Sequence, residues 1–290
     1  RTLMIKWGRR GHDALLAALF LALSPTLSGC SSDDEADSGV NGMHPVVLTT
    51  EMAGMTRATI ADNTFVAGNL VNLRQGTTSK TYKMSNATTM VVNSGEPFYW
   101  KWNEDSYTFD AWSYGNNTTP ALTMDLSDQS SGSNNEFLYA PKKTIGWKTT
   151  SKSLIFYHQL AHIVLNITYD RTPTTTNVVI GSASMSNKGT FTIPSSGNYG
   201  TWTTTSSGTI KPKVETAKTK YSAVIFPTAS YTGVLFTITT SGTDFGGTFP
   251  YSVSAAKFEV GKEYTYNIKV ENDLITVTKA NVTVNPWQSE

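Results

Sequence analysis

Apolar and polar side chains alternate with a period of two along most of the chain after residue 40. In the run 46–52, one side of the strand would carry Val46, Leu48, Thr50 and Met52. Turn-forming Gly, Asn and Ser residues separate such runs, and no segment after residue 40 carries the sustained apolar stripe of a helix. Many short strands with this spacing predict an all-β fold built from antiparallel β-sandwiches.

The alternation is weakest between residues 142 and 152, which predicts a domain boundary there. We expect an N-terminal β-sandwich domain at 44–148 and a C-terminal one at 149–290. Both lengths lie in the ordinary range for a domain. The run 153–169, just after the boundary, has the composition of a strand throughout.

The end of the chain changes the phase of its alternation. Ile275 and Val277 share one parity, and the opposite parity is taken up by Ala280, Val282 and Val284. One regular strand cannot place both sets on the same face, so a bulge or hinge is expected near Lys279. The tail is therefore predicted to form two strands, of which the last can detach.

Residues 1–29 have the composition of an export signal. Basic residues precede the uninterrupted apolar run 14–23, which is too short to span a bilayer. The signal ends in Leu27-Ser28-Gly29-Cys30, which resembles the bacterial lipobox. That resemblance implies cleavage before Cys30 and a covalent lipid on the thiol of this cysteine, which is the only one in the chain. The alternative is an ordinary secretory signal with an incidental cysteine.

Residues 30–43 are small, polar and acidic, and cannot bury enough apolar area to fold. This segment is expected to be a flexible tether. Asp33, Asp34 and Glu35 follow the cysteine closely and resemble the acidic signal that routes lipoproteins to the outer face of the outer membrane. The alternative is a simple solvated linker.

Composition and motifs exclude several classes of function. The formal net charge is +1 and only 16% of residues are charged, so no nucleic-acid partner is expected. His158 and His162 have a spacing used by zinc-binding helices, but on a strand they would lie about 13 Å apart, too far to share a metal. The sequence has no nucleophile elbow, P-loop or dinucleotide fingerprint. We expect no catalytic residues, no metal and no cofactor other than the lipid.

Several motifs, in this order, resemble the fimbrillin family of lipoprotein pilins. They are Leu27-Ser28-Gly29-Cys30, Thr56-Arg57-Ala58-Thr59, Tyr107-Thr108-Phe109-Asp110-Ala111, the run 156–165, the run 261–268, and Val284-Asn285-Pro286-Trp287. The resemblance covers most of the mature chain. It implies two transthyretin-like β-sandwich domains in tandem and a structural role in a pilus that serves cell adhesion. Other pilin subunits would be the partners, with the outer membrane bound through the lipid before maturation.

The same resemblance implies proteolytic maturation between Arg57 and Ala58. Cutting there would release the lipid together with the strand that carries Val46, Leu48, Thr50 and Met52. The exposed groove would then take up the last strand of a neighbouring subunit, with Ala280, Val282 and Val284 facing inward. Because such donation is head to tail, it builds an open filament. Judged without the resemblance, Arg57 is an exposed loop arginine.

Two other functions fit the sequence. The chain could be an uncleaved anchor or tip subunit of the same pilus. It could also be a monomeric surface lipoprotein that binds glycans on a host or bacterial surface. The aromatic residues that would stack on sugars are Phe98, Tyr99, Trp100, Trp102, Tyr107, Phe109, Trp112 and Tyr114, although core packing explains most of them.

Overall fold

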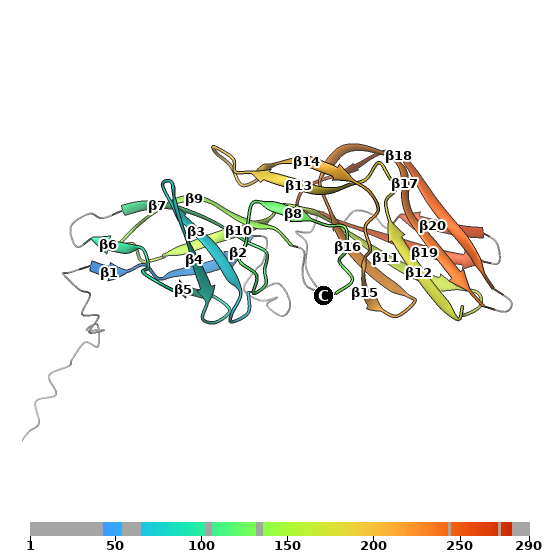
Figure 1. Ribbon diagram of the computed structural model, residues 1–290, viewed down its shortest axis with the longest axis horizontal. Coiled ribbons are helices and arrows are strands. Elements are labelled where there is room, and N and C mark those ends of the chain that lie inside the picture. Colours follow the sequence, from blue (N-terminus) through green and yellow to red (C-terminus); the bar gives the residue numbers. More distant parts are fainter. Residues whose placement is uncertain are drawn as a thin grey trace, which may run out of the picture. The chain divides into compact units, whose positions relative to one another are not determined.

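The computed structural model describes residues 43–53, 65–101, 106–131, 136–242, 245–271 and 274–279. All regular elements in these ranges are strands, β1 to β20 in chain order (Figure 1). The predicted all-β class is confirmed. None of the described elements is a helix long and apolar enough to cross a membrane.

Seven strands in the N-terminal half close into a barrel with the ring order β10-β2-β5-β4-β3-β7-β9. They are β2 (Leu48–Met52), β3 (Leu70–Gln75), β4 (Thr78–Met84), β5 (Thr89–Val92), β7 (Ser106–Ser113), β9 (Leu138–Gly146) and β10 (Ser153–His158). Beside the barrel, β1 (Met43–Pro45) pairs with β6 (Tyr99–Lys101). Each strand of a closed ring has two hydrogen-bonded neighbours, so removing any one of them would create two edges.

The C-terminal half contains three sheets. The largest has the order β15-β16-β11-β19-β20, formed by β15 (Lys213–Thr216), β16 (Lys220–Ile225), β11 (Ala161–Tyr169), β19 (Glu263–Glu271) and β20 (Leu274–Lys279). The second consists of β12 (Thr175–Ile180), β17 (Thr228–Ser241) and β18 (Gly247–Phe258). The third consists of β14 (Thr201–Ser207), β13 (Ser186–Thr192) and β8 (Thr123–Asp125).

Two strand pairs depart from the antiparallel pattern that the sequence predicted. β2 pairs in parallel with β10, and β11 pairs in parallel with β19 over eight residues. Both pairs join segments about 100 residues apart in sequence. Parallel neighbours need a long connection, and here β3 to β9 lie between β2 and β10 in sequence, while β12 to β18 lie between β11 and β19. Alternation along one strand carries no information about the direction of its partner.

The expected division at residues 148 and 149 stays a prediction, and strand pairing crosses it in both directions. β10 follows the predicted boundary but completes the barrel between β2 and β9. β8 precedes it but pairs with β13 in the C-terminal half. The weak pattern between 142 and 152 corresponds to the end of β9 and the turn before β10.

Two clusters of buried side chains form the core, and they meet at β7 and β9. Along β7, Phe109 and Ala111 belong to the barrel cluster, whereas Trp112 points the other way into the second cluster. Tyr139 on β9 also reaches the second cluster, where its ring lies 5.6 Å from the ring of Phe191 on β13. Both faces of β7 and β9 are therefore buried over part of their length, which removes the polar alternation typical of a half-exposed strand.

The tight packing of the hairpin β13–β14 gives a testable prediction at Gly200. A Cβ atom at Gly200 would overlap the ring of Phe191 and the carbonyl oxygen of Thr192, and the carbonyl belongs to the backbone. We expect Gly200→Ala to lower the free energy of unfolding by about 1–3 kcal/mol, measured by urea denaturation.

Gly246→Ala is the matched control, because the nearest atom to a Cβ there is 3.6 Å away. It should leave the urea midpoint almost unchanged. Equal effects of the two substitutions would contradict the packing described for the hairpin.

Candidate assembly site

β2 is held in the barrel between β10 and β5. Its backbone amides at Thr49 and Ala53 donate to the carbonyl oxygens of Lys152 and Phe156, both at 2.8 Å. On the other side, the amide of Thr50 donates to the carbonyl oxygen of Thr88 at 2.7 Å. β2 therefore closes the ring by hydrogen bonds on both of its edges.

The side chains of β2 alternate as the sequence predicted. Val46, Leu48 and Thr50 are buried, and Met52 packs partly buried against the barrel cluster. Val47, Thr49 and Glu51 are exposed. An alternating strand with one buried face was the expectation for 46–52, and the regular strand occupies Leu48–Met52.

The groove occupied by β2 does not itself select a strand direction. β2 runs parallel to β10 and antiparallel to β5. A strand of the opposite direction would also have one parallel and one antiparallel neighbour. The inward-facing side chains, and not the sense of the hydrogen bonds, must therefore fix the direction of any occupant.

The short strand β1 extends the same segment beyond the barrel. Met43 to Pro45 pair with β6, and the amide of Val46 donates to the carbonyl oxygen of Phe98 at 2.7 Å. The ring of His44 stacks on that of Trp147, with centroids 4.1 Å apart. Residues 43–53 thus contact the N-terminal half at several points along their length.

Other site residues predicted from the sequence lie outside the described residues. They are Cys30, Arg57, Ala58, Ala280, Val282 and Val284. The last described strand, β20, pairs antiparallel with β19 and has half-buried Ile275 and Val277 against the second cluster. The alternation predicted for these two residues therefore matches their burial, while their change of phase with the tail stays a prediction.

The two histidines of the zinc-like spacing lie on different strands, His158 at the end of β10 and His162 in β11. Within the described part of the chain, no group of three or more His, Cys, Asp or Glu side chains is placed to hold a metal. His162 contacts Glu263 at 3.1 Å across the parallel pair β11–β19. His158 is buried, and burial, with a smaller effect of His162, lowers the pKa of His158 to about 3.

Most of the aromatic cluster that could bind sugars belongs to the core. Phe98, Trp100, Phe109 and Trp112 are buried, and Tyr99, Tyr107 and Tyr114 are half-buried. Trp102 lies outside the described residues. Core packing therefore accounts for the four buried rings, which leaves little aromatic surface for stacking on a sugar.

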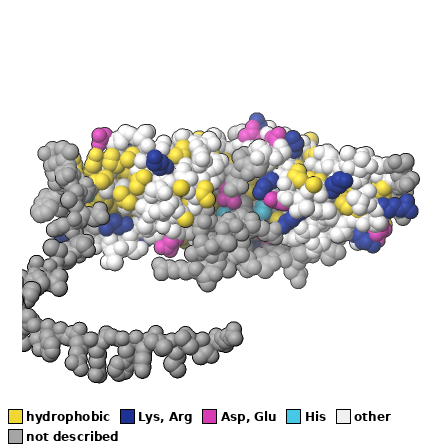
Figure 2. Space-filling model, turned by 90° about the horizontal axis from the view of Figure 1, so that it is seen from below, with side chains coloured by type: hydrophobic (Ala, Val, Ile, Leu, Met, Phe, Trp, Pro, Cys, Tyr) yellow, Lys and Arg dark blue, Asp and Glu magenta, His cyan; other side chains and the backbone are white. Residues whose placement is uncertain are grey.

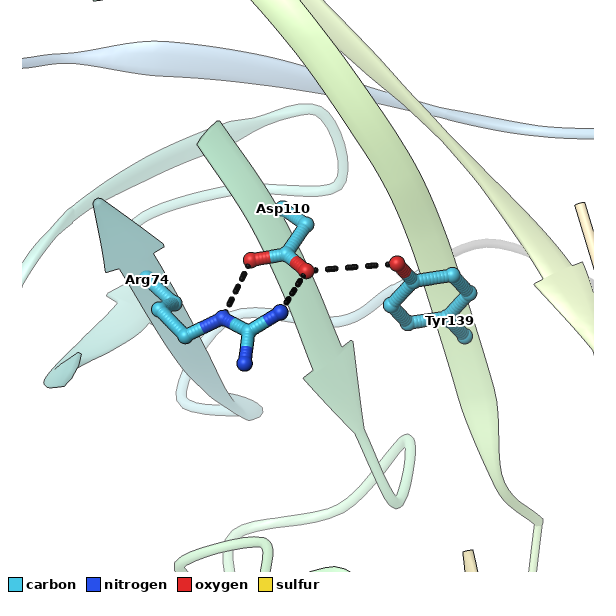
Figure 3. Close-up of polar contacts among 3 residues, drawn as sticks. All are labelled: Arg74, Asp110 and Tyr139. Atoms are coloured by element: carbon cyan, nitrogen blue, oxygen red, sulfur yellow. Dashed lines mark hydrogen bonds and ion pairs between the residues drawn. The ribbon is translucent and has the colours of Figure 1, made fainter. Parts of the chain in front are cut away.

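A partly buried ion pair that no sequence pattern indicated joins two neighbouring strands of the barrel wall (Figure 3). The Arg74 guanidinium on β3 pairs with both carboxylate oxygens of Asp110 on β7, with Nε donating to Oδ1 at 2.8 Å. The hydroxyl of Tyr139 on β9 donates to Oδ2 of Asp110 at 3.2 Å. The hydrogen bond to Asp110 raises the pKa of Arg74, whereas burial is the main reason that the pKa of Tyr139 is raised.

Gln159 joins the barrel to the hairpin β13–β14. Its side-chain nitrogen donates to the carbonyl oxygens of Tyr157 and Asn198, both at 3.0 Å. Its side-chain oxygen accepts from the amide of Gly200 at 3.0 Å, and its own carbonyl accepts from the indole of Trp202 at 2.9 Å. The run 153–169, predicted as strand throughout, is interrupted at this residue, where β10 ends and β11 begins after Leu160.

The charges on the outer surface are mixed. On the face drawn in Figure 2, Lys and Arg side chains are interspersed with Asp and Glu side chains, and no extended basic area is visible. Described ion pairs on the surface include Lys188 with Asp125 at 2.7 Å and Lys262 with Glu259 at 2.6 Å. Such exposed pairs contribute little to stability and do not form a steering field.

Proteins of known structure share this all-β fold. A candidate cell adhesion protein from Bacteroides uniformis aligns with a TM-score of 0.63 and 22% identity, over 81% of this chain and 97% of that one. One from Bacteroides ovatus aligns with a TM-score of 0.59 and 18% identity, over 86% and 99% of the two chains. No curated protein matches the chain.

The family model for fimbrillin-like proteins matches residues 55–287, which is most of the sequence. The chain therefore belongs to the fimbrillin-like family. Membership of this family gives the chain the role of a pilus subunit, located in the pilus at the cell surface. The resemblance seen in the sequence motifs is confirmed.

The buried His158 predicts how stability depends on pH. Its pKa is about 3 in the folded protein and near the ordinary value of 6.5 in the unfolded chain, so the unfolded chain binds more protons between these values. The stability due to neutral His158 is complete above pH 6.5 and is lost as the pH falls. We expect this residue to lower the free energy of unfolding by up to about 1.4 kcal/mol per pH unit below 6.5.

Urea denaturation at pH 7, 6, 5 and 4 measures this dependence. His158→Met should unfold with a shallower loss of stability between pH 6 and 4, whatever its stability at pH 7. His162, which is half-buried beside Glu263, is retained in the variant. Identical pH slopes for the two proteins would contradict this prediction, because they would show that His158 binds its proton equally well in the folded and the unfolded chain.

Proposed function

We propose that this pilin assembles by strand exchange at the groove now filled by β2. Cleavage after Arg57 removes β1 and β2, and the last strand of a neighbouring copy takes their place. The observation that carries the proposal is the position of β2. It closes the barrel by hydrogen bonds on both edges, yet it lies before the predicted cut and is separable from the remaining strands.

The energetics favour replacement over an empty groove. Fully burying a side chain such as Val46 or Leu48 stabilises by about 1.5–3 kcal/mol, so losing both costs about 3–6 kcal/mol. The backbone groups of β10 and β5 that now bond to β2 would also lose their partners. These losses are a large fraction of the 5–15 kcal/mol typical of a whole domain, so the trimmed subunit has a strong drive to bind a new strand.

The tail of a neighbouring copy has the pattern that the groove requires. Ala280, Val282 and Val284 alternate with polar residues, as do the inward side chains of β2. The tail follows β20, an edge strand of its sheet, so donating the tail need not break the pairing of β19 with β11. Because the groove accepts either strand direction, the side-chain register of this alternating set would decide the orientation.

Before cleavage, we propose, the chain is an outer-membrane lipoprotein held at the cell surface by a lipid on Cys30. The lipobox motif and the acidic residues after it support this localisation. Each buried methylene of an acyl chain contributes about 0.8 kcal/mol, so several chains anchor the precursor firmly. Cleavage after Arg57 would release the subunit from this anchor and open the groove in one step.

The proposed role is structural and not enzymatic. The protein would act through polymerisation with other pilin subunits, either copies of itself or related chains, and through adhesion to a host or bacterial surface. No cofactor is needed for strand exchange. An uncleaved anchor or tip subunit would share the groove but keep β2 in place. A monomeric glycan-binding lipoprotein is less favoured, because four aromatic side chains that it would use are buried.

Arg57→Ala tests the cleavage step. In cells labelled with a radioactive fatty acid, we expect the variant to stay full-length, lipidated and monomeric, while the wild-type protein loses the label as it matures. Cys30→Ser, as the control, should never take up the label. A variant that assembles with a normally shortened N-terminus would show that cleavage occurs at another residue.

The donor strand is tested by introducing charge on one of its faces. Val282→Asp with Val284→Asp should stop the trimmed protein from forming heat-resistant ladders on electrophoresis without boiling. The reason is that a buried, unpaired carboxylate costs several kcal/mol. Asn281→Asp with Thr283→Asp adds the same charge on the opposite parity and should leave the ladders intact. Ladders that survive the first pair of changes would place the donor strand elsewhere.

A further inference from the structure

Tyr199 lies on the surface, and the buried side chain of Gln159 holds the backbone on both sides of it. Its side chain is 47% exposed, and it is the one aromatic among the large exposed apolar side chains of the described residues. Gln159, itself buried, bonds to the carbonyl of Asn198 and to the amide of Gly200, the two neighbours of Tyr199 in the chain. The backbone on both sides of Tyr199 is therefore held by hydrogen bonds to a buried side chain.

Two side chains of β10 extend the exposed area around this ring. Tyr157 meets Tyr199 edge to face, with ring centroids 5.7 Å apart. Ile155, 37% exposed, lies two residues earlier on the same outward face of β10. We call Ile155, Tyr157 and Tyr199 the tyrosine patch.

The patch has a charged rim. Glu51 on β2 lies opposite Ile155 in the parallel register. On the other side, Lys262 is in electrostatic contact with Tyr199 and forms an ion pair with Glu259. An apolar, aromatic centre surrounded by charged groups is the usual composition of a protein–protein contact, and tyrosine is enriched in such centres.

The position of the patch points to its occupant. β10 carries Ile155 and Tyr157 of the patch on its outward face, and the same strand forms one wall of the groove filled by β2. A strand that fills this groove pairs with β10, whose outward side chains Ile155 and Tyr157 belong to the patch. We propose that the tyrosine patch contacts the neighbouring copy of this chain whose last strand fills the groove, as a second contact besides the exchanged strand.

This inference rests on the proposed strand exchange and adds a contact between the folded bodies of the two subunits. Body contact and strand insertion act within one complex, so the patch adds to the affinity of the strand through a raised effective concentration. Preformed, rigid side chains such as Tyr199 lose little entropy on binding, which favours their use in such a contact.

The experiment uses the full chain carrying Cys30→Ser, cut with an arginine-specific protease. Two quantities are measured: the affinity of the trimmed protein for a synthetic peptide of residues 274–290, and the rate at which trimmed subunits polymerise. The test variant combines Ile155→Ser with Tyr199→Ser. Val214→Ser is the matched control, since Val214 is 50% exposed on β15, away from β10. Tyr199→Phe keeps the ring.

We expect the double variant to polymerise about tenfold more slowly than wild type, a change typical of losing one contact centre, while its affinity for the peptide stays within about twofold. The control and Tyr199→Phe should polymerise like wild type. Equal polymerisation of the double variant and wild type would overturn the patch contact while leaving strand exchange intact. A wild-type trimmed protein that does not bind the peptide would overturn both.

A double variant that loses affinity for the peptide as well would also contradict the proposal, because the patch would then support the groove and not a separate contact. Thermal unfolding of the uncut variants distinguishes this result from misfolding. Unfolding temperatures equal to that of wild type are expected, since both replaced side chains are exposed.

Discussion

The parallel pairing of β2 with β10 is the interaction on which the N-terminal half depends. It completes the ring of hydrogen bonds, and it places Val46, Leu48 and Thr50 over a core that the other six strands leave open. Most barrels gain stability because closure removes strand edges. Here the closing strand precedes Arg57 in the sequence, so the cleavage proposed after that residue would remove the element that completes the barrel.

β10 links this closing strand to the rest of the molecule. It continues through Gln159 into β11, which is central in the largest C-terminal sheet. Gln159 satisfies its own polar groups by bonding to the hairpin β13–β14, while Tyr139 and Trp112 pass from the barrel wall into the second core cluster. The Arg74–Asp110–Tyr139 contacts hold three barrel strands in register at this junction, where one unsatisfied group would be costly.

The sequence predicted those features that depend on local alternation. The all-β class, the buried face of 46–52, and the shared parity of Ile275 and Val277 follow from period-two patterns. Pairing over a long sequence separation could not be predicted in this way. The parallel pairs β2–β10 and β11–β19 join residues far apart in the chain, as does the pairing of β8 with β13 across the expected boundary. The partners of Arg74 and Gln159 are also distant in sequence. Asp110 belongs to the motif 107–111, but a single acidic residue in a strand does not predict which arginine it will pair with.

The strand in the groove has neighbours on both sides that run along its length, and this geometry has a mechanical consequence. A force along the axis of that strand loads its hydrogen bonds to β10 and β5 in shear. All of these bonds then resist the force together, instead of breaking one after another. The force then passes from β10 to β11 along covalent bonds, and from β11 to β19 through eight further paired positions. A fibre built from such subunits would yield to peeling at a strand end long before it yielded to tension along its length.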